Sequence, residues 1–162
     1  MSFHTHSLHL EILYDIISMN PYRKSGGKMR ILICDDDVLI IEQLQKYILS
    51  YFDLNHIKCP ELLSFTSGEA LLADKGEKDI VFLDIEMPGM NGIYVGNELK
   101  KANKNVIIFV VTSYSEYLDE AMRFHVFRYL SKPLDKQRFL RNLKDAIVYY
   151  NSISVKYLES TR

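Results

Sequence analysis

The sequence has 162 residues, enough for one domain with a short extension. It holds 20 Lys and Arg against 21 Asp and Glu, for a formal charge of −1, and 48% of its residues are hydrophobic. This composition excludes a wholly disordered chain, and the near-zero charge gives no electrostatic reason to expect nucleic acid or a membrane as a partner. No apolar run approaches the ~20 residues of a bilayer-spanning helix. Two cysteines, Cys34 and Cys59, are too few for a disulfide framework, so we expect a cytoplasmic protein.

Residues 1–28 differ from the rest of the chain and form a leader or extension. An apolar stretch over residues 8–19 predicts a short helix, and Asn20-Pro21 follows it. The first ten residues contain no Lys or Arg, which argues against a secretory signal. Two interpretations stay open: a docking helix that belongs to the protein, or upstream sequence read through before a natural start at Met29. The second interpretation predicts that a chain starting at Met29 keeps its stability and its function.

From Met29 onward, apolar runs typical of buried strands alternate with segments whose apolar residues recur at helical spacing. The expected strands are 30–34, 62–65, 79–84, 106–111 and 127–130, and the expected helices are 38–52, 67–73, 93–102, 116–124 and one after Lys132-Pro133. Five strands, each followed by a helix, predict an α/β fold in which a five-stranded parallel sheet carries helices on both faces. Asp37 is expected to cap the first of these helices.

Polar residues stand at the ends of four of the expected strands. They are Asp35-Asp36 after the first strand, Asp84 after the third, Thr112 after the fourth and Lys132 after the fifth. Because the carboxyl ends of parallel strands meet at one edge of a sheet, we expect these side chains to converge. Converging carboxylates repel one another unless a cation lies among them, and oxygen ligands favour Mg²⁺. Such a set suits a phosphoryl group, and a carboxylate can become an aspartyl phosphate.

Four ordered motifs carry a family resemblance. They are Ile-Leu-Ile-Cys-Asp-Asp, Val-Phe-Leu-Asp-Ile-Glu-Met-Pro-Gly-Met-Asn-Gly, Phe-Val-Val-Thr-Ser and Arg-Tyr-Leu-Ser-Lys-Pro. Residues 29–150 thereby resemble a response-regulator receiver domain of two-component signalling. The resemblance implies a flavodoxin-like (CheY-like) three-layer α/β/α sandwich with strand order 2-1-3-4-5. Asp-Ile-Glu-Met-Pro-Gly, Thr-Ser-Tyr-Ser-Glu-Tyr and the aromatic-rich segment 124–129 resemble the LytTR-linked (Agr/Lyt-like) subgroup.

The resemblance also implies a magnesium site and a phosphoacceptor. Asp84 matches the phosphoacceptor, and Asp35 and Asp36 match the acidic pair that holds Mg²⁺, with Asp36 the more direct ligand. Asp84 itself and the backbone carbonyl of Glu86 complete the protein ligands of the ion. On this interpretation the chain is a phosphoacceptor signalling domain rather than an enzyme.

Three further residues match the parts of the family that respond to the phosphoryl group. Thr112 matches the hydroxyl that follows the phosphoryl group, Lys132 matches the lysine that pairs with it, and Tyr129 matches the aromatic that changes rotamer on activation. We expect a cis peptide bond at Lys132-Pro133, because a sharp turn there would aim Lys132 back at Asp84. Tyr129 and its neighbour Leu130 should point to opposite faces of the sheet.

The expected partners also follow from the resemblance. A sensor histidine kinase donates the phosphoryl group, and a homodimer through the fourth helix, fifth strand and fifth helix of the domain is plausible. DNA is contacted only through a domain that this chain lacks, because residues 151–162 are long enough only for a linker or for the start of a LytTR-type domain. Residues 152–157 alternate like the first strand of such a domain.

Two other classes of function remain open. In a haloacid-dehalogenase-type phosphatase, Asp35 would be the nucleophile, with Thr112 and Lys132 as later residues of that site. Against this interpretation, no strand after Lys132 ends in a further acidic pair, and Asp84 would have no role. A pure interaction module that no longer takes phosphate is the third class, and the intact Asp84, Thr112 and Lys132 argue against it.

Overall fold

The computed structural model describes residues 28–160, and the helix expected over residues 8–19 lies outside them. Within the described residues, five parallel strands form one sheet in the order β2-β1-β3-β4-β5, as the resemblance implied. The strands are β1 (Arg30–Cys34), β2 (Glu61–Phe65), β3 (Ile80–Leu83), β4 (Ile107–Thr112) and β5 (Arg128–Ser131). The helices are α2 (Val38–Leu54), α3 (Gly68–Ala73), α4 (Gly92–Ala102), α5 (Leu118–Arg123) and α6 (Lys136–Ser160).

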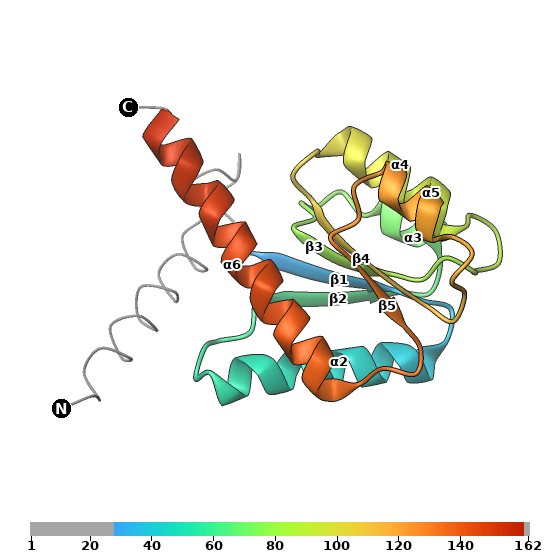
Figure 1. The fold of residues 1–162 in the computed structure, drawn as a ribbon, viewed down its shortest axis with the longest axis horizontal. Helices are drawn as coiled ribbons and strands as arrows, with labels where there is room; N and C mark the ends of the chain where they lie inside the picture. The colour runs from blue at the N-terminus through green and yellow to red at the C-terminus, as the bar shows by residue number, and fades with distance from the viewer. Residues whose placement is uncertain (1–27, 161–162) are drawn as a thin grey trace.

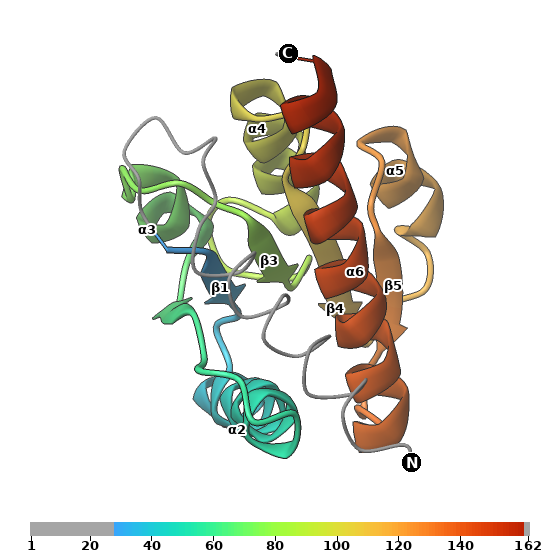
Figure 2. The same cartoon turned by 90° about the vertical axis from the view of Figure 1, so that its left-hand side faces the viewer.

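The helices cover the sheet on both faces and make a three-layer sandwich (Figures 1 and 2). On one face α2 and α6 pack against Ile31 and Ile33, and on the other α3, α4 and α5 pack against Leu32 and Cys34. Successive side chains of a strand point to opposite faces, so β1 contributes to both cores. The three central strands are buried on both sides, which explains why they are apolar apart from Arg30 at the start of β1 and Thr112 at the end of β4.

Aromatic side chains join α2 and α6 to the middle of the sheet. The rings of Phe82 and Phe109, on β3 and β4, are stacked with their centroids 4.7 Å apart. Phe139 of α6 contacts Phe82 at 5.2 Å, and Tyr47 of α2 contacts Phe139 at 5.6 Å between centroids. Because aromatic pairs add to the free energy of area burial, this face of the sheet is firmly packed.

Side chains cap four of the described helices: Asp37 caps α2, Ser67 caps α3, Asn91 caps α4 and Asp135 caps α6. The Asp37 carboxylate accepts a hydrogen bond from the backbone N–H of Leu39, which confirms the predicted cap of α2. Asn91 caps α4 in the same way, through the backbone N–H of Tyr94. The six-residue α5 begins at Tyr117 without a side-chain cap.

The last helix is longer than the sequence pattern indicated. α6 runs over 25 residues to Ser160, so the prediction that residues 152–157 form a strand is wrong. Alternation over six residues does not separate a strand from a helix, and no Gly or Pro follows Pro133 to end the helix. Among the described residues, no helix is both long and apolar enough to cross a bilayer.

Candidate functional site

Backbone hydrogen bonds extend the sheet into the residues that carry the candidate chemistry. The N–H of Asp84 donates to the carbonyl of Cys34 at 2.9 Å, and the N–H of Lys132 donates to the carbonyl of Thr112 at 2.9 Å. The N–H of Asp35 likewise donates to the carbonyl of Phe65, at the end of β2. The strand ends are thus held side by side, and their side chains emerge at one edge of the sheet.

Three carboxylates meet at this edge. Asp35, Asp36 and Asp84 each offer an oxygen that lies within 4.8 Å of the other two. Asp35 and Asp84 are buried, with 1% and 6% of their surface exposed, whereas Asp36 is open to solvent. An all-oxygen cluster with one open side matches what Mg²⁺ prefers, because this ion keeps several of its waters. The structure therefore brings together the three side chains that the sequence assigned to the metal.

Lys132 joins the cluster from the end of β5. Its Nζ donates to Asp35 Oδ2 at 2.7 Å and to Asp84 Oδ2 at 3.2 Å, while 14% of its side chain is exposed. The Lys132-Pro133 bond is cis, as predicted. One ammonium thus bridges two of the buried carboxylates.

The local environment shifts the pKa of both partners in the buried pair. Burial raises the pKa of Asp35, although hydrogen bonds from Lys132 and from the backbone of Asp37 act against that rise. Burial alone would lower the pKa of Lys132, but the hydrogen bond to Asp35 and the charge of Asp84 outweigh it, so the pKa is raised. Lys132 therefore stays charged, and burial of Asp35 leaves a site that a further cation would stabilise.

Thr112 and Tyr129 lie beside the cluster and are linked through the loop after β4. Thr112 is 1% exposed, and its Oγ1 accepts a long hydrogen bond of 3.4 Å from the N–H of Tyr114. The hydroxyl of the half-buried Tyr129 donates to the backbone carbonyl of Tyr114. Tyr129 packs on the α3–α5 side of the sheet and Leu130 on the α2–α6 side, which confirms their predicted opposite orientation.

One residue that the sequence analysis left without a role is Gly92, the first residue of α4. A Cβ atom there would lie 2.1 Å from the backbone oxygen of Asp84 and 2.7 Å from Cα of Ile85. The Gly92 N–H donates to the carbonyl of Ile85 at 2.8 Å, so the start of α4 lies directly against the end of β3. The Asn-Gly pair that begins the helix was the available signal, but sequence alone does not reveal such close backbone contact.

Two tyrosines in the loop after β4 also lacked an assigned role. Tyr117 Oη donates to Glu86 Oε1 at 2.5 Å, and this bond raises the pKa of Tyr117 to about 12. The rings of Tyr114 and Tyr117 meet edge to face, with centroids 6.4 Å apart. The motif Thr-Ser-Tyr-Ser-Glu-Tyr contains both residues, but nothing in the sequence says which partner each hydroxyl finds.

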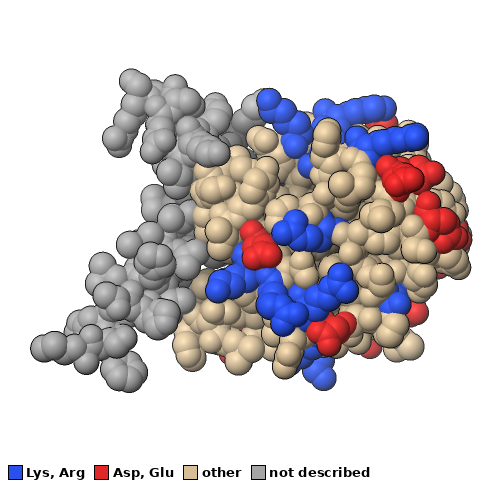
Figure 3. Space-filling view, viewed as in Figure 1, with Lys and Arg blue, Asp and Glu red and all other residues tan. Residues whose placement is uncertain are grey.

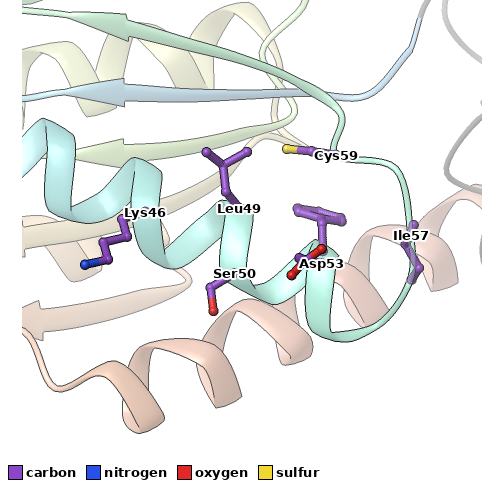
Figure 4. Close-up of a pocket in the computed structure, with 7 residues that line it drawn as sticks. Lys46, Leu49, Ser50, Asp53, Ile57 and Cys59 are labelled. Carbon is purple, nitrogen blue, oxygen red and sulfur yellow. The ribbon is translucent and has the colours of Figure 1, made fainter.

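A separate cavity lies at the opposite, amino-terminal edge of the sheet. It measures about 500 Å³ and lies between the end of α2 and the loop that leads to β2 (Figure 4). Its lining comprises Lys46, Leu49, Ser50, Phe52, Asp53, Ile57 and Cys59. Burial raises the pKa of Cys59, so its thiol is less reactive than a free one. The cavity shares no residue with the acidic cluster.

Comparison with known proteins gives the same picture as the geometry. Residues 31–144 match the response regulator receiver domain. An uncharacterized response regulatory protein of Yersinia pestis is 35% identical over 129 residues, which cover 76% of this chain and 52% of that protein. The sensory transduction protein LytT of Oceanobacillus iheyensis is 34% identical over 116 residues, covering 69% of this chain and 45% of LytT. The transcriptional regulatory protein BtsR of Escherichia coli is 29% identical over 116 residues, which cover 71% of this chain and 46% of BtsR. This chain thus spans about half the length of these relatives.

Solved structures share the fold. The response regulatory domain of mrkE from Klebsiella pneumoniae has a TM-score of 0.69 at 23% identity, over 76% of this chain and 99% of that one. The response regulator TrrA of Thermotoga maritima, solved with Mg²⁺ and BeF, has a TM-score of 0.62 at 29% identity. The match covers 73% of this chain and 98% of that one.

The phosphatase alternative is not favoured by these findings. Its nucleophile would be Asp35, but Asp35 is buried, and its oxygens accept from Asp37 N at 2.9 Å and Lys132 Nζ at 2.7 Å. The family match instead runs from β1 into α6 and includes all five strands. The relatives named LytT and BtsR support the LytTR-linked subgroup. This chain belongs to the response regulator receiver domain family.

Proposed function

We propose that Asp84 accepts a phosphoryl group from a partner histidine kinase in the presence of Mg²⁺. The observation that carries this proposal is the meeting of Asp84 with two other carboxylates and the Lys132 ammonium at one edge of the sheet. Asp35 and Asp36 hold the ion together with Asp84 and the backbone carbonyl of Glu86. The bound ion neutralises charge on the phosphoryl oxygens.

The side chains around Asp84 have distinct tasks in the transfer. Asp84 Oδ1 accepts from the backbone N–H of Ile85 at 2.8 Å, which fixes the orientation of the carboxylate. One Asp84 oxygen forms the new bond to phosphorus as the bond from phosphorus to the imidazole nitrogen of the donor breaks. Lys132 presents its ammonium to the oxygens of the transferred group, and the Thr112 hydroxyl donates a hydrogen bond to them.

Phosphorylation then acts on the loop after β4 and on Tyr129. The added charge offers Thr112 a strong acceptor and draws it toward Asp84. This movement vacates space for the ring of Tyr129, whose hydroxyl leaves the carbonyl of Tyr114. The face formed by α5, β5 and the start of α6 changes as a result, and this change is the output signal.

The same face provides the surface for a symmetric dimer. The first turn of α5 carries Asp119 and Glu120, whereas exposed basic residues line the first half of α6. Figure 3 shows Lys and Arg spread over the side of the molecule that carries α6. In a two-fold dimer each acidic turn can face the basic helix of its partner. In a longer protein that carries a DNA-binding domain, such a dimer would control transcription, in the cytoplasm and away from any membrane.

Intact-mass analysis tests the proposal. The protein is incubated with Mg²⁺ and a small acyl phosphate, and one added phosphoryl mass is expected. Asp84→Asn keeps the shape of the side chain but removes the nucleophile, so it should take up no phosphate, whereas Asp53→Asn, far away on α2, should behave like the wild type. Uptake that survives in Asp84→Asn, or that is equal in a chelator, contradicts the proposal.

A further inference from the structure

A hydrogen bond between Tyr117 and Glu86 joins the two loops on either side of Asp84. Glu86 lies two residues after Asp84 in the loop between β3 and α4, and Tyr117 ends the loop between β4 and α5. Their side chains meet at 2.5 Å at the rim of the site, where Glu86 is exposed and Tyr117 is half-buried. Because β3 and β4 are neighbours in the sheet, this bond links the loop that begins with Asp84 to the loop that follows the adjacent strand.

Each of these loops is also fixed on its far side. Glu69 Oε1 of α3 accepts from the backbone N–H of Met90 at 2.9 Å, which holds the loop after β3. Before phosphorylation, the Tyr129 hydroxyl donates to the carbonyl of Tyr114, which holds the loop after β4. The Tyr117–Glu86 bond does not involve Tyr129, so it is placed to set the separation of the two loops after Tyr129 has moved as well.

We propose that Tyr117 is a positioning residue that closes the rim of the Asp84 site and slows exchange between that site and solvent. This inference rests on the proposed phosphorylation of Asp84. With the hydroxyl in place, the two loops limit the approach of water to the aspartyl phosphate and the approach of a small donor to Asp84. Tyr117 thereby sets the lifetime of the phosphorylated state without touching the phosphoryl group.

The position of the bond separates this role from a structural one. A hydrogen bond between exposed side chains contributes little to the free energy of unfolding, because water replaces it in the unfolded chain. Its loss should therefore leave global stability unchanged and alter only the local opening of the two loops. Tyr117→Phe also keeps the charge of Glu86, so an effect of this variant does not arise from electrostatic repulsion of the donor.

The test compares Tyr117→Phe with Tyr94→Phe, which removes a hydroxyl from an exposed tyrosine on α4. Phosphate uptake and loss are followed by intact mass with Mg²⁺ and a small acyl phosphate. Tyr117→Phe should shorten the half-life of the aspartyl phosphate about threefold or more, the kinetic equivalent of one hydrogen bond, and should speed uptake by a similar factor. Tyr94→Phe should match the wild type.

Two additional measurements complete the experiment. Glu86→Ala should shorten the half-life as Tyr117→Phe does, and the double variant should be no faster than either single variant, because both remove the same bond. In the absence of Mg²⁺ and phosphate, amide hydrogen exchange over residues 85–91 and 113–117 should rise in Tyr117→Phe and in Glu86→Ala, and it should stay at the wild-type level in Tyr94→Phe. Normal uptake with an unchanged half-life in Tyr117→Phe, or additive effects in the double variant, would overturn the inference. No uptake by the wild type would overturn the proposed function and the inference with it.

Discussion

At the scale of single residues, Asp35 carries a carboxylate in a buried position, where burial disfavours the ionised form. Its carboxylate is 1% exposed, and burial raises its pKa even with Lys132 in contact. A carboxyl whose pKa is higher in the folded than in the unfolded state binds protons more readily when folded, so stability falls as the pH rises through that range. Without a cation, the Asp35 carboxylate therefore lowers the stability of the domain at neutral pH.

We expect Asp35→Asn to be more stable than the wild type at pH 7 in a chelator, because the raised pKa of Asp35 means that its ionised form is disfavoured in the folded state. The amide oxygen can still accept from one of the two donors, which reach different oxygens of Asp35: the backbone N–H of Asp37 binds Oδ1 and Lys132 Nζ binds Oδ2. The raised pKa of Asp35 already includes the attraction of the ammonium. The advantage should disappear as the pH falls below the ordinary Asp pKa of about 3.9. Urea unfolding across this pH range measures the difference.

The exposed neighbour provides the control for this measurement. Asp36→Asn should change the free energy of unfolding little, because Asp36 is open to solvent. If Asp35→Asn is instead less stable than the wild type at pH 7, then the ion pair with Lys132 stabilises the folded state more than burial of the carboxylate destabilises it. Either variant should weaken the uptake of phosphate, because both remove a proposed ligand of Mg²⁺.

Gly92 should tolerate no side chain. In Gly92→Ala the new Cβ would meet backbone atoms of Asp84 and Ile85, which cannot move without disturbing the end of β3. We expect a loss of about 3 kcal/mol in the free energy of unfolding. Chemical denaturation gives the loss, and phosphate uptake should fall as well.

A second glycine of the same helix allows a matched comparison. In Gly96→Ala the nearest atom is the tip of the Phe124 ring, at 2.6 Å, and a side chain can shift where backbone cannot. Alanine also gains about 1 kcal/mol in helix propensity at an interior position. Gly96→Ala should therefore cost clearly less than Gly92→Ala, and an equal cost would show that backbone contact is not the cause.

At the scale of elements, an ion cluster around Arg30 joins β1, β2 and the segment between α3 and β3. The guanidinium donates to Glu61 at 2.9 Å and to both Asp74 oxygens at 2.9 and 3.1 Å, while only 8% of Arg30 is exposed. The hydrogen bond and charge of Arg30 lower the pKa of Asp74. A lowered carboxyl pKa adds stability above its ordinary value, and this is lost as the pH falls through the lowered one.

We expect Arg30→Ala to lower the free energy of unfolding by about 3 kcal/mol at pH 7, because it leaves Asp74 without its main partner. This difference from the wild type should shrink as the pH falls below about 3.9, where Asp74 becomes protonated in the unfolded chain. The exposed pair of Lys101 and Glu98 is the control, and Lys101→Ala should leave the free energy of unfolding nearly unchanged. Equal losses in the two variants would contradict the role of burial.

Most of the elements could be predicted from sequence because their signals are local. Continuous apolar runs indicated the central strands, and Asp37 indicated the start of α2 through its cap. Residues 152–157 show where such reasoning fails, because a short alternating segment fits a strand and a helix equally well. In the structure these residues continue α6, because this part of the chain contains no Gly or Pro that would end the helix.

The candidate site was predictable to a different degree. Asp35 and Asp36 follow β1, Asp84 follows β3 and Lys132 follows β5, and the carboxyl ends of these parallel strands lie at one edge of the sheet, so topology brings the residues together. The contact of Gly92 with the backbone of Asp84 and the pairing of Tyr117 with Glu86 depend on how loops fold in three dimensions. Loop conformation leaves little periodic signal in a sequence, so these partners emerged only from the structure.

At the scale of the whole molecule, exposed apolar side chains mark the face expected to change on phosphorylation. Leu118 and Met122 are 44% and 57% exposed, and their spacing of four residues places them on one side of α5. If this face forms the dimer, beryllofluoride with Mg²⁺ should strengthen self-association. In analytical ultracentrifugation Met122→Glu should weaken it about tenfold in dissociation constant.

Another exposed apolar residue provides a control that distinguishes this interface from non-specific hydrophobic association. Leu54, at the end of α2, is 65% exposed and lies at the opposite edge of the sheet from the acidic cluster. Leu54→Glu should leave the dissociation constant unchanged. A similar loss in both variants, or no response to beryllofluoride, would show that α5 is not the dimer surface.

The unbroken length of α6 has a mechanical consequence. The helix begins four residues after Lys132 and continues for 25 residues, so it forms a rod whose base adjoins the acidic site. At about 1.5 Å per residue the rod is about 37 Å long, and a tilt of about 5° at its base would carry its far end about 3 Å. Such a lever arm converts an angular adjustment too small to disturb the core into a displacement comparable to the diameter of an atom. Whatever follows Ser160 in a longer protein is therefore attached to the point of the domain where leverage is largest.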